Sequence, residues 1–302
     1  NLAAVGGELH SFTDTQDGWL LSEEENSVHA VLFRRDFRDY YERQGWSVYT
    51  THNIGGILQF TGRYQWDEFS SLDPEVEWGL FGDNLGRSSF RPNPALEAQQ
   101  IHSLRTDLQL DTRDRRSNPR RGWFANALFE RAGGFLGGDA RFKRYLGDVR
   151  RYQPLSSGAR MDLRLRLGTA KGALPQQYLY TLGGFGSLRG FDFKEFRGDR
   201  MVLINAEYWI DAERQWHSDL PIDGLHLGAF VDAGSTWYAD DADNPFDQVD
   251  QLVSDSSRDD ELKWQTNVGL AAGLGDGISI YASRPLKHQE SWMLMLRFSR
   301  SL

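Results

Sequence analysis

Apolar and charged side chains alternate strictly between residues 161 and 167. One set comprises Met161, Leu163, Leu165 and Leu167, and the other comprises Asp162, Arg164 and Arg166. Successive side chains of a β-strand point to opposite faces, so this segment would have one leucine-rich face and one fully charged face. A soluble sandwich also has an apolar and a polar face. Such a strong contrast is nevertheless more typical of a strand that separates lipid from the wet interior of a membrane barrel.

The same alternation recurs along the chain and predicts twelve strands. They lie near residues 2–12, 45–53, 55–67, 101–113, 120–132, 139–152, 157–170, 200–211, 222–233, 263–273, 276–285 and 290–301. We therefore predict an all-β fold, in which residues 1–302 form a single antiparallel transmembrane β-barrel domain. About twelve strands are expected, and sixteen is the alternative.

The composition is compatible with a barrel and excludes several other classes of protein. Hydrophobic residues make up 39% of the 302 residues, and no run approaches the ~20 apolar residues of a spanning helix. Ten Trp and 31 Gly suit a membrane barrel. The chain has no cysteine, which excludes disulfides and thiolate metal sites. A net charge of −9 argues against a nucleic-acid partner.

The predicted connections alternate in length. Short links are expected at 53–55, 113–119, 153–156 and 274–275, and longer ones at 67–100, 171–199 and 234–262. Outer-membrane barrels have short periplasmic turns and longer external loops. This pattern therefore predicts that both termini are periplasmic.

Residues 22–44 differ from the strands. Ser22 and Glu25 have the spacing of a helix capping box, and apolar residues such as Val28, Val31 and Leu32 recur at roughly helical spacing. We interpret the segment as an amphipathic helix that lies on the membrane surface or plugs an opening. An ordinary packed helix or a charged hairpin is the alternative.

A glycine-rich stretch at 181–190 provides the central functional hypothesis. It contains Arg189 with no acidic neighbour in sequence. In the following strands, Glu207 and Asp232 lie opposite the apolar faces, so both would point into the barrel. If the loop at 171–199 folds inward, its arginine meets two carboxylates.

Several spaced motifs resemble one family. The loop motif comprises Gly183, Gly184, Ser187, Leu188, Arg189, Gly190 and Phe191, and an earlier strand motif includes Asp111, Arg113, Asp114, Gly122 and Trp123. The stretches 205–208, 230–237, 275–277 and 283–286 follow in the same order. Together they resemble the bacterial surface-antigen superfamily, which contains the BamA and TamA insertases and the FhaC-type secretion transporters. The resemblance covers residues 101–302 well and 1–100 poorly.

This resemblance implies a location and a function. It implies an outer-membrane barrel of a Gram-negative bacterium, with membrane lipids and lipopolysaccharide around it and client outer-membrane proteins as partners. It also implies an ionic lock between Arg189, Glu207 and Asp232. Its function would be outer-membrane protein or lipid assembly, or translocation, through a seam between the first and last strands, here 2–12 and 290–301.

The sequence departs from that family in two respects. Family members usually have sixteen strands and periplasmic POTRA domains, and this sequence has room for neither. A barrel of fewer strands would close poorly and leave an edge that invites a homodimer.

Catalytic and metal-binding patterns are weak. No catalytic residue is assigned, because the histidines lie in no catalytic motif and Ser187 is not in a nucleophile elbow. We therefore expect no enzyme and no cofactor. The alternative is a structural or channel-type barrel. A lipid-modifying enzyme is a second, less favoured alternative. Aspartates between 240 and 250 could bind calcium, but their spacing favours a solvated loop and no metal site.

Overall fold

The computed structural model describes residues 2–73, 78–81, 89–216, 224–239, 263–275, 277–287 and 291–298. Its main element is one antiparallel sheet of twelve strands, in the order β1-β2-β3-β4-β5-β6-β7-β10-β11-β12-β13-β14. Every neighbour in this sheet is also the next main-sheet strand along the chain. The predicted all-β, twelve-stranded architecture is thereby confirmed.

The strands have the following bounds. They are β1 (Leu2–Asp14), β2 (Tyr41–Ile54), β3 (Leu58–Ser71), β4 (Gln99–Asp111), β5 (Gly122–Ala132), β6 (Phe142–Pro154), β7 (Ala159–Lys171), β10 (Arg200–Asp211), β11 (Leu225–Trp237), β12 (Gln265–Leu274), β13 (Ile278–Pro285) and β14 (Met293–Arg297). A small second sheet pairs β8 (Tyr180–Leu182) with β9 (Phe196–Gly198). The helices are α1 (Glu23–Phe33) and α3 (Ala212–Trp216), with short 3₁₀ turns η1 (Gly134–Leu136) and η2 (Gln176–Tyr178).

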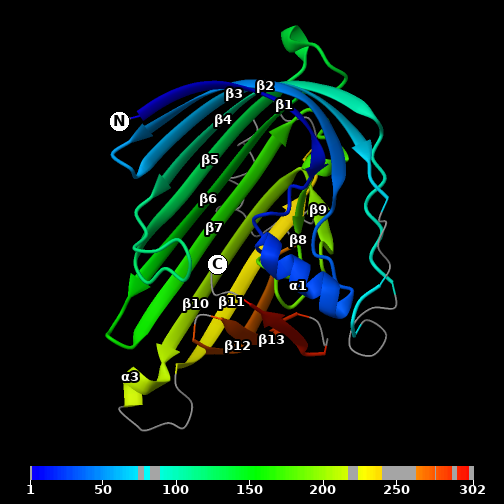
Figure 1. Ribbon diagram of the computed structural model, residues 1–302. Coiled ribbons are helices and arrows are strands. Elements are labelled where there is room, and N and C mark those ends of the chain that lie inside the picture. Colours follow the sequence, from blue (N-terminus) through cyan, green and yellow to red (C-terminus); the bar gives the residue numbers. More distant parts are fainter. Residues whose placement is uncertain are drawn as a thin grey trace, which may run out of the picture.

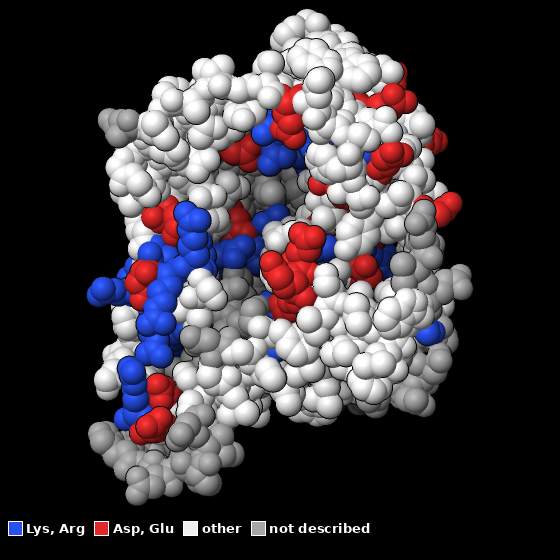
Figure 2. Space-filling view, in the orientation of Figure 1, with Lys and Arg blue, Asp and Glu red and all other residues white. Residues whose placement is uncertain are grey.

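The sheet curls around a concave face, and α1 and the β8–β9 pair lie on that side (Figure 1). Side chains on the concave face are polar. Asp162, Arg164 and Arg166 are buried, whereas Leu163 and Leu165 are 39% and 40% exposed. Figure 2 shows charged side chains gathered around a hollow, beside large uncharged areas. Charged residues are rarely buried in soluble proteins, so this inverted distribution identifies the outer face as the one that meets lipid.

The helix is shorter than the predicted range 22–44. Ser22 caps α1 as expected, because its hydroxyl accepts a hydrogen bond from the Glu25 N–H at 3.2 Å. Arg34 then adopts a left-handed conformation and ends the helix, and the segment from Tyr41 onward belongs to β2.

The buried face of α1 is polar, which the apolar spacing did not predict. Glu25, Asn26 and His29 are buried, whereas Val31 is 49% exposed. The helix therefore does not bury an apolar stripe against a core. Its polar face instead packs against polar groups of the barrel, such as the Arg297 guanidinium on β14.

The two outer strands of the sheet, β1 and β14, are not paired with each other within the described residues. These two strands lie within the ranges 2–12 and 290–301 that the resemblance implies for the seam, apart from the end of β1 at 13–14, and no pairing joins them in the described part of the chain. The chain instead places α1 beside β14, where the Glu25 carboxylate meets the Arg297 guanidinium at 3.3 Å. The sheet is open at this seam.

Among the described residues, no helix has the length and apolar character needed to cross a bilayer. Parts of the predicted strands 222–233, 276–285 and 290–301 and of the long links 67–100 and 234–262 lie outside the described residues, and so do two smaller features. These are the acidic segment 240–250 and the central residue of the turn at 275–277.

The outward direction of the leucines is open to test. Leu165 lies mid-way along β7, so an arginine there would face the hydrocarbon. We expect Leu165→Arg to lower the free energy of unfolding in vesicles by about 2–4 kcal/mol. Ser117→Arg, on the exposed link between β4 and β5, is the matched control and should have no measurable effect. Equal effects of both substitutions on urea unfolding would contradict a lipid-facing Leu165.

Candidate functional site

The inward loop, residues 171–199, enters the concave side of the sheet and places Arg189 in the interior. The side chain of Arg189 is 3% exposed. Its Nε and Nη2 atoms donate to Asp232 Oδ2 and Oδ1 at 2.9 and 2.6 Å. Its Nη1 donates to Glu207 Oε1. The structure thus brings together the three side chains that the strand phases and the resemblance single out.

Asp232 on β11 accepts more hydrogen bonds than these two. The Arg189 backbone N–H donates to it at 3.2 Å, and the side-chain amides of Asn205 and Asn267 donate at 2.8 and 2.9 Å. Charge-assisted bonds of this kind stabilise a buried carboxylate that has lost its water. The carboxylate is therefore a junction between the loop and two strands besides its own.

Glu207 is held by a second donor. The indole Nε1 of Trp209, two residues further along β10, donates to Glu207 Oε2 at 2.7 Å. The carboxylate is therefore shared between a loop cation and a neighbouring side chain on the same inward face. Glu207 and Trp209 can form this hydrogen bond because residues i and i+2 of a strand face the same way.

Aromatic rings enclose the guanidinium. Its Cζ atom lies 3.8 Å from the ring centroid of Phe230 and 5.2 Å from that of Tyr281. Burial by itself lowers the pKa of Arg189, but the charges of Asp232 and Glu207 raise it well above its ordinary value. The arginine stays charged, and the rings exclude water from the ion pairs.

The rest of the loop motif shapes the backbone that delivers Arg189. Ser187 Oγ accepts from the Gly183 N–H at 3.0 Å and donates to the Gly184 carbonyl at 3.3 Å. Gly183 has φ 119°, and a Cβ there would lie 2.1 Å from the Asp192 carbonyl oxygen. Only glycine fits that position.

Apolar residues of the motif anchor the loop on either side of the arginine. Leu188 and Phe191 are buried in a cluster with Leu203 of β10. At Gly190 a Cβ would lie 2.6 Å from the Asn267 Cβ, so the glycine permits close contact with β12. The Arg189 carbonyl accepts from Ser283 Oγ at 2.6 Å.

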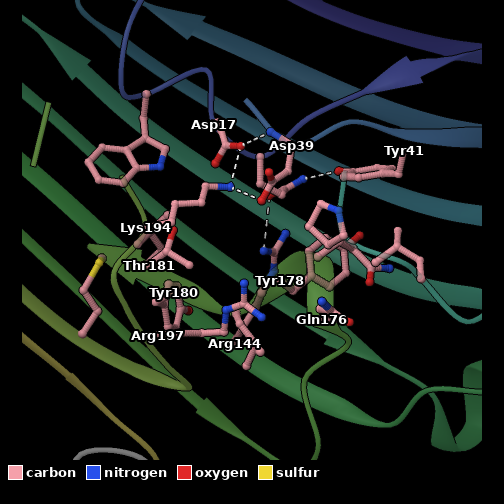
Figure 3. A pocket seen from close by; sticks show the side chains of 18 of the residues that line it. Asp17, Asp39, Tyr41, Arg144, Gln176, Tyr178, Tyr180, Thr181, Lys194 and Arg197 are labelled. Carbon is pink, nitrogen blue, oxygen red and sulfur yellow. Dashed lines mark hydrogen bonds and ion pairs between the residues drawn. The ribbon is translucent and has the colours of Figure 1, made fainter. Parts of the chain in front are cut away.

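A second contact ties the inward loop to the segment around α1. Lys194 Nζ lies 2.6 Å from both Asp17 Oδ2 and Asp39 Oδ2 (Figure 3). Burial raises the pKa of Asp17 despite this lysine, whereas the pKa of Asp39 is lowered because Lys194 and Arg91 outweigh its burial. The same lysine thus joins the residues before and after α1.

The earlier strand motif lies at the β4–β5 link. Asp111 and Arg113 form an ion pair with a 2.8 Å contact, and Asp114 Oδ1 accepts from the Arg120 N–H at 2.9 Å. Gly122 has φ 116°, and Trp123 is 45% exposed. The contacts described for these five positions stabilise the turn and none is with Arg189.

Sequence reasoning assigned no role in the site to several residues that complete it. Asn267, Tyr281 and Ser283 contact Asp232 or Arg189 from β12 and β13. The sequence does contain a signal for Asn267. Thr266 and Val268 lie on the outward face of their strand, so the amide of Asn267 between them must face inward. Tyr281 and Ser283 are two residues apart on β13, so they also share one face.

The interior position of Arg189 leads to a prediction for the inward loop. Arg189→Ala leaves two buried carboxylates without their cation, and we expect it to cost about 3–5 kcal/mol. Glu207→Gln and Asp232→Asn should also loosen the loop. Limited proteolysis within residues 183–195 measures the effect. The control is Arg197→Ala, because Arg197 is an exposed arginine of the same loop. Unchanged digestion in all three site variants would contradict the lock.

The sequence matches one protein family and one curated relative. The model of the Omp85 superfamily domain matches residues 10–280. The outer membrane protein assembly factor BamA of Nitratidesulfovibrio vulgaris is 27% identical over 252 residues, which cover 76% of this chain and 30% of that relative. This chain therefore spans about a third of the length of the curated relative.

A solved structure shares the fold. BamA from Haemophilus ducreyi lacking POTRA domains 1–3 superposes with a TM-score of 0.63 at 16% identity, over 99% of this chain and 58% of that one. CdiB from Acinetobacter baumannii reaches a TM-score of 0.48 at 13% identity, over 99% and 47% of the two chains. The resemblance inferred from the sequence motifs is confirmed, and the chain belongs to the Omp85 superfamily.

Proposed function

We propose that this chain assists the assembly or translocation of outer-membrane proteins, without covalent catalysis, at the open seam between β1 and β14. It would act in the outer membrane of a Gram-negative bacterium with both termini periplasmic. Membrane lipids and lipopolysaccharide would surround it, and unfolded outer-membrane proteins would be its clients. The N. vulgaris relative carries the description of an assembly factor.

The open seam is the observation that carries this proposal. An unpaired strand exposes backbone N–H and C=O groups, which cost several kcal/mol each in hydrocarbon, as an order of magnitude. Such an edge is a template for an incoming strand, which gains main-chain hydrogen bonds by adding to it. A strand of a client barrel that is still folding also has unpaired backbone N–H and C=O groups, so it gains from pairing with this edge.

The helix α1 acts as a provisional neighbour of β14. The Glu25 carboxylate accepts from the Phe298 backbone N–H at 2.9 Å and from the Arg297 guanidinium at 3.3 Å. The imidazole of His29 makes a backbone hydrogen bond with Leu296. The Phe298 N–H and the Leu296 backbone are groups that a neighbouring strand could satisfy instead, so an incoming strand would take the place of the Glu25 and His29 side chains.

The site chemistry supports a role without catalysis. The Ser187 hydroxyl is engaged with the backbone of its own loop, and the charged groups around Arg189 are paired with one another. A nucleophile needs an adjacent base to activate it. The ionic lock would instead keep the inward loop fixed while the seam changes.

The test uses a chain that contains no native cysteine. A Glu25→Cys, Arg297→Cys variant is reconstituted in vesicles and joined with a short bismaleimide. We expect the unmodified chain to speed insertion of an unfolded eight-stranded barrel about tenfold over empty vesicles, or about 1.4 kcal/mol. Cross-linking should return the rate to that of empty vesicles.

The same double variant treated with a monofunctional maleimide is the control. It carries the same substitutions and added atoms but leaves α1 free to move. The proposal fails if vesicles with the wild-type chain insert the client no faster than empty ones. Ion conductance without insertion would instead indicate the channel-type alternative.

A further inference from the structure

A cavity of about 720 Å³ lies between α1, the inward loop and the edge of β14. Its walls are largely aromatic and sulfur-containing. They include Phe33, Phe37, Phe185, Phe193, Met293 and Met295. Pockets for small molecules have volumes of about 300–1,000 Å³ and mostly apolar walls. The proposed function leaves this cavity without a role.

The cavity reaches both faces of the sheet. Met295 is 7% exposed and faces the interior, whereas Ile280 and Leu294 are 53% and 70% exposed on the outer face. All three line the cavity, which is possible only because β14 is an edge strand. A molecule in the bilayer can therefore enter from the side.

Charged groups line the same cavity, and two of the four are already engaged. Arg91 pairs with Asp39, and the Asp36 carboxylate accepts from a side-chain amide at 2.9 Å and a backbone N–H at 3.0 Å. For Arg35 and Asp192, no side-chain hydrogen bond or ion pair occurs within the described residues. Arg35 and Asp192 are thus the two charged lining residues whose side chains have no partner in the part of the chain that the structure describes.

A buried nitrogen of the cavity lining has no partner among the described residues. His29 is 3% exposed and lines the cavity. Its Nε2 atom has no hydrogen-bond partner among the described residues. Buried polar atoms are normally satisfied, so this nitrogen marks a position where a polar group of a ligand can bind.

We propose that this cavity binds one phospholipid molecule from the bilayer. A fatty acyl chain lies among the phenylalanine and methionine side chains. The phosphate lies at Arg35, because guanidinium groups bind phosphate through charge-assisted hydrogen bonds. Asp192 favours a headgroup that carries an ammonium beside its phosphate, so phosphatidylethanolamine binds better than phosphatidylglycerol.

The full chain, purified in detergent, is titrated with each phospholipid and bound lipid is counted by native mass spectrometry. We expect one phosphatidylethanolamine per chain. Arg35→Ala should weaken binding of both phospholipids about tenfold, and Asp192→Asn should abolish the preference between them. Arg115→Ala, at an exposed arginine of the β4–β5 link, should change neither.

A second pair of variants tests the cavity without altering charge. Met293→Trp adds bulk inside the cavity and should reduce bound lipid at least severalfold. Leu270→Trp adds the same bulk on the lipid-facing side of β12, where Leu270 is 62% exposed, and should not. The proposal would be overturned if Arg35→Ala and Met293→Trp bound as much phospholipid as the wild type. Capture of lipid A or of an extended peptide in place of the phospholipid would also overturn it. Lipid binding and client insertion are measured in separate experiments, so the failure of one proposal leaves the other standing.

Discussion

The interaction between Arg189 and the carboxylates of Glu207 and Asp232 organises this molecule. A loop that enters a barrel from one end has few backbone hydrogen bonds to hold it there. The buried ion pairs supply that attachment at Asp232, with Asn267 contributing from β12. Removal of one partner strands a charge away from water, which is far more costly than the loss of a surface ion pair. The position of the whole inward loop therefore depends on a few atoms.

The fixed loop and the open seam are complementary parts of one arrangement. The loop motif is anchored to β10 through β13, while β14 lacks a strand on its outer side among the described residues. Lys194 extends the anchored region to the residues that flank α1. The helix thus lies between the anchored loop and the edge of β14. In the proposed function, conformational change would be confined to this edge, where an incoming strand would enter.

The sequence predicts most of the strands because alternation is a local property. Leu163 and Arg164 differ in direction whatever the rest of the chain does, and the same argument predicts that Glu207 faces inward. The neighbours of Arg189 on β12 and β13 were harder to predict, because they depend on where a loop docks. The polar buried face of α1 was missed because Val28 and Val31 suggested an apolar contact. Its true partner is a strand edge, and strand edges need hydrogen bonds more than apolar area.

A double-mutant cycle between Arg189 and Asp232 tests the central claim most directly. The free energy of unfolding in vesicles is measured for the wild type, both single alanine variants and the double variant. If the two side chains form a buried pair, the double variant should be less destabilised than the sum of the single effects, by about 2–3 kcal/mol. Additive effects, with a coupling energy near zero, would contradict the account.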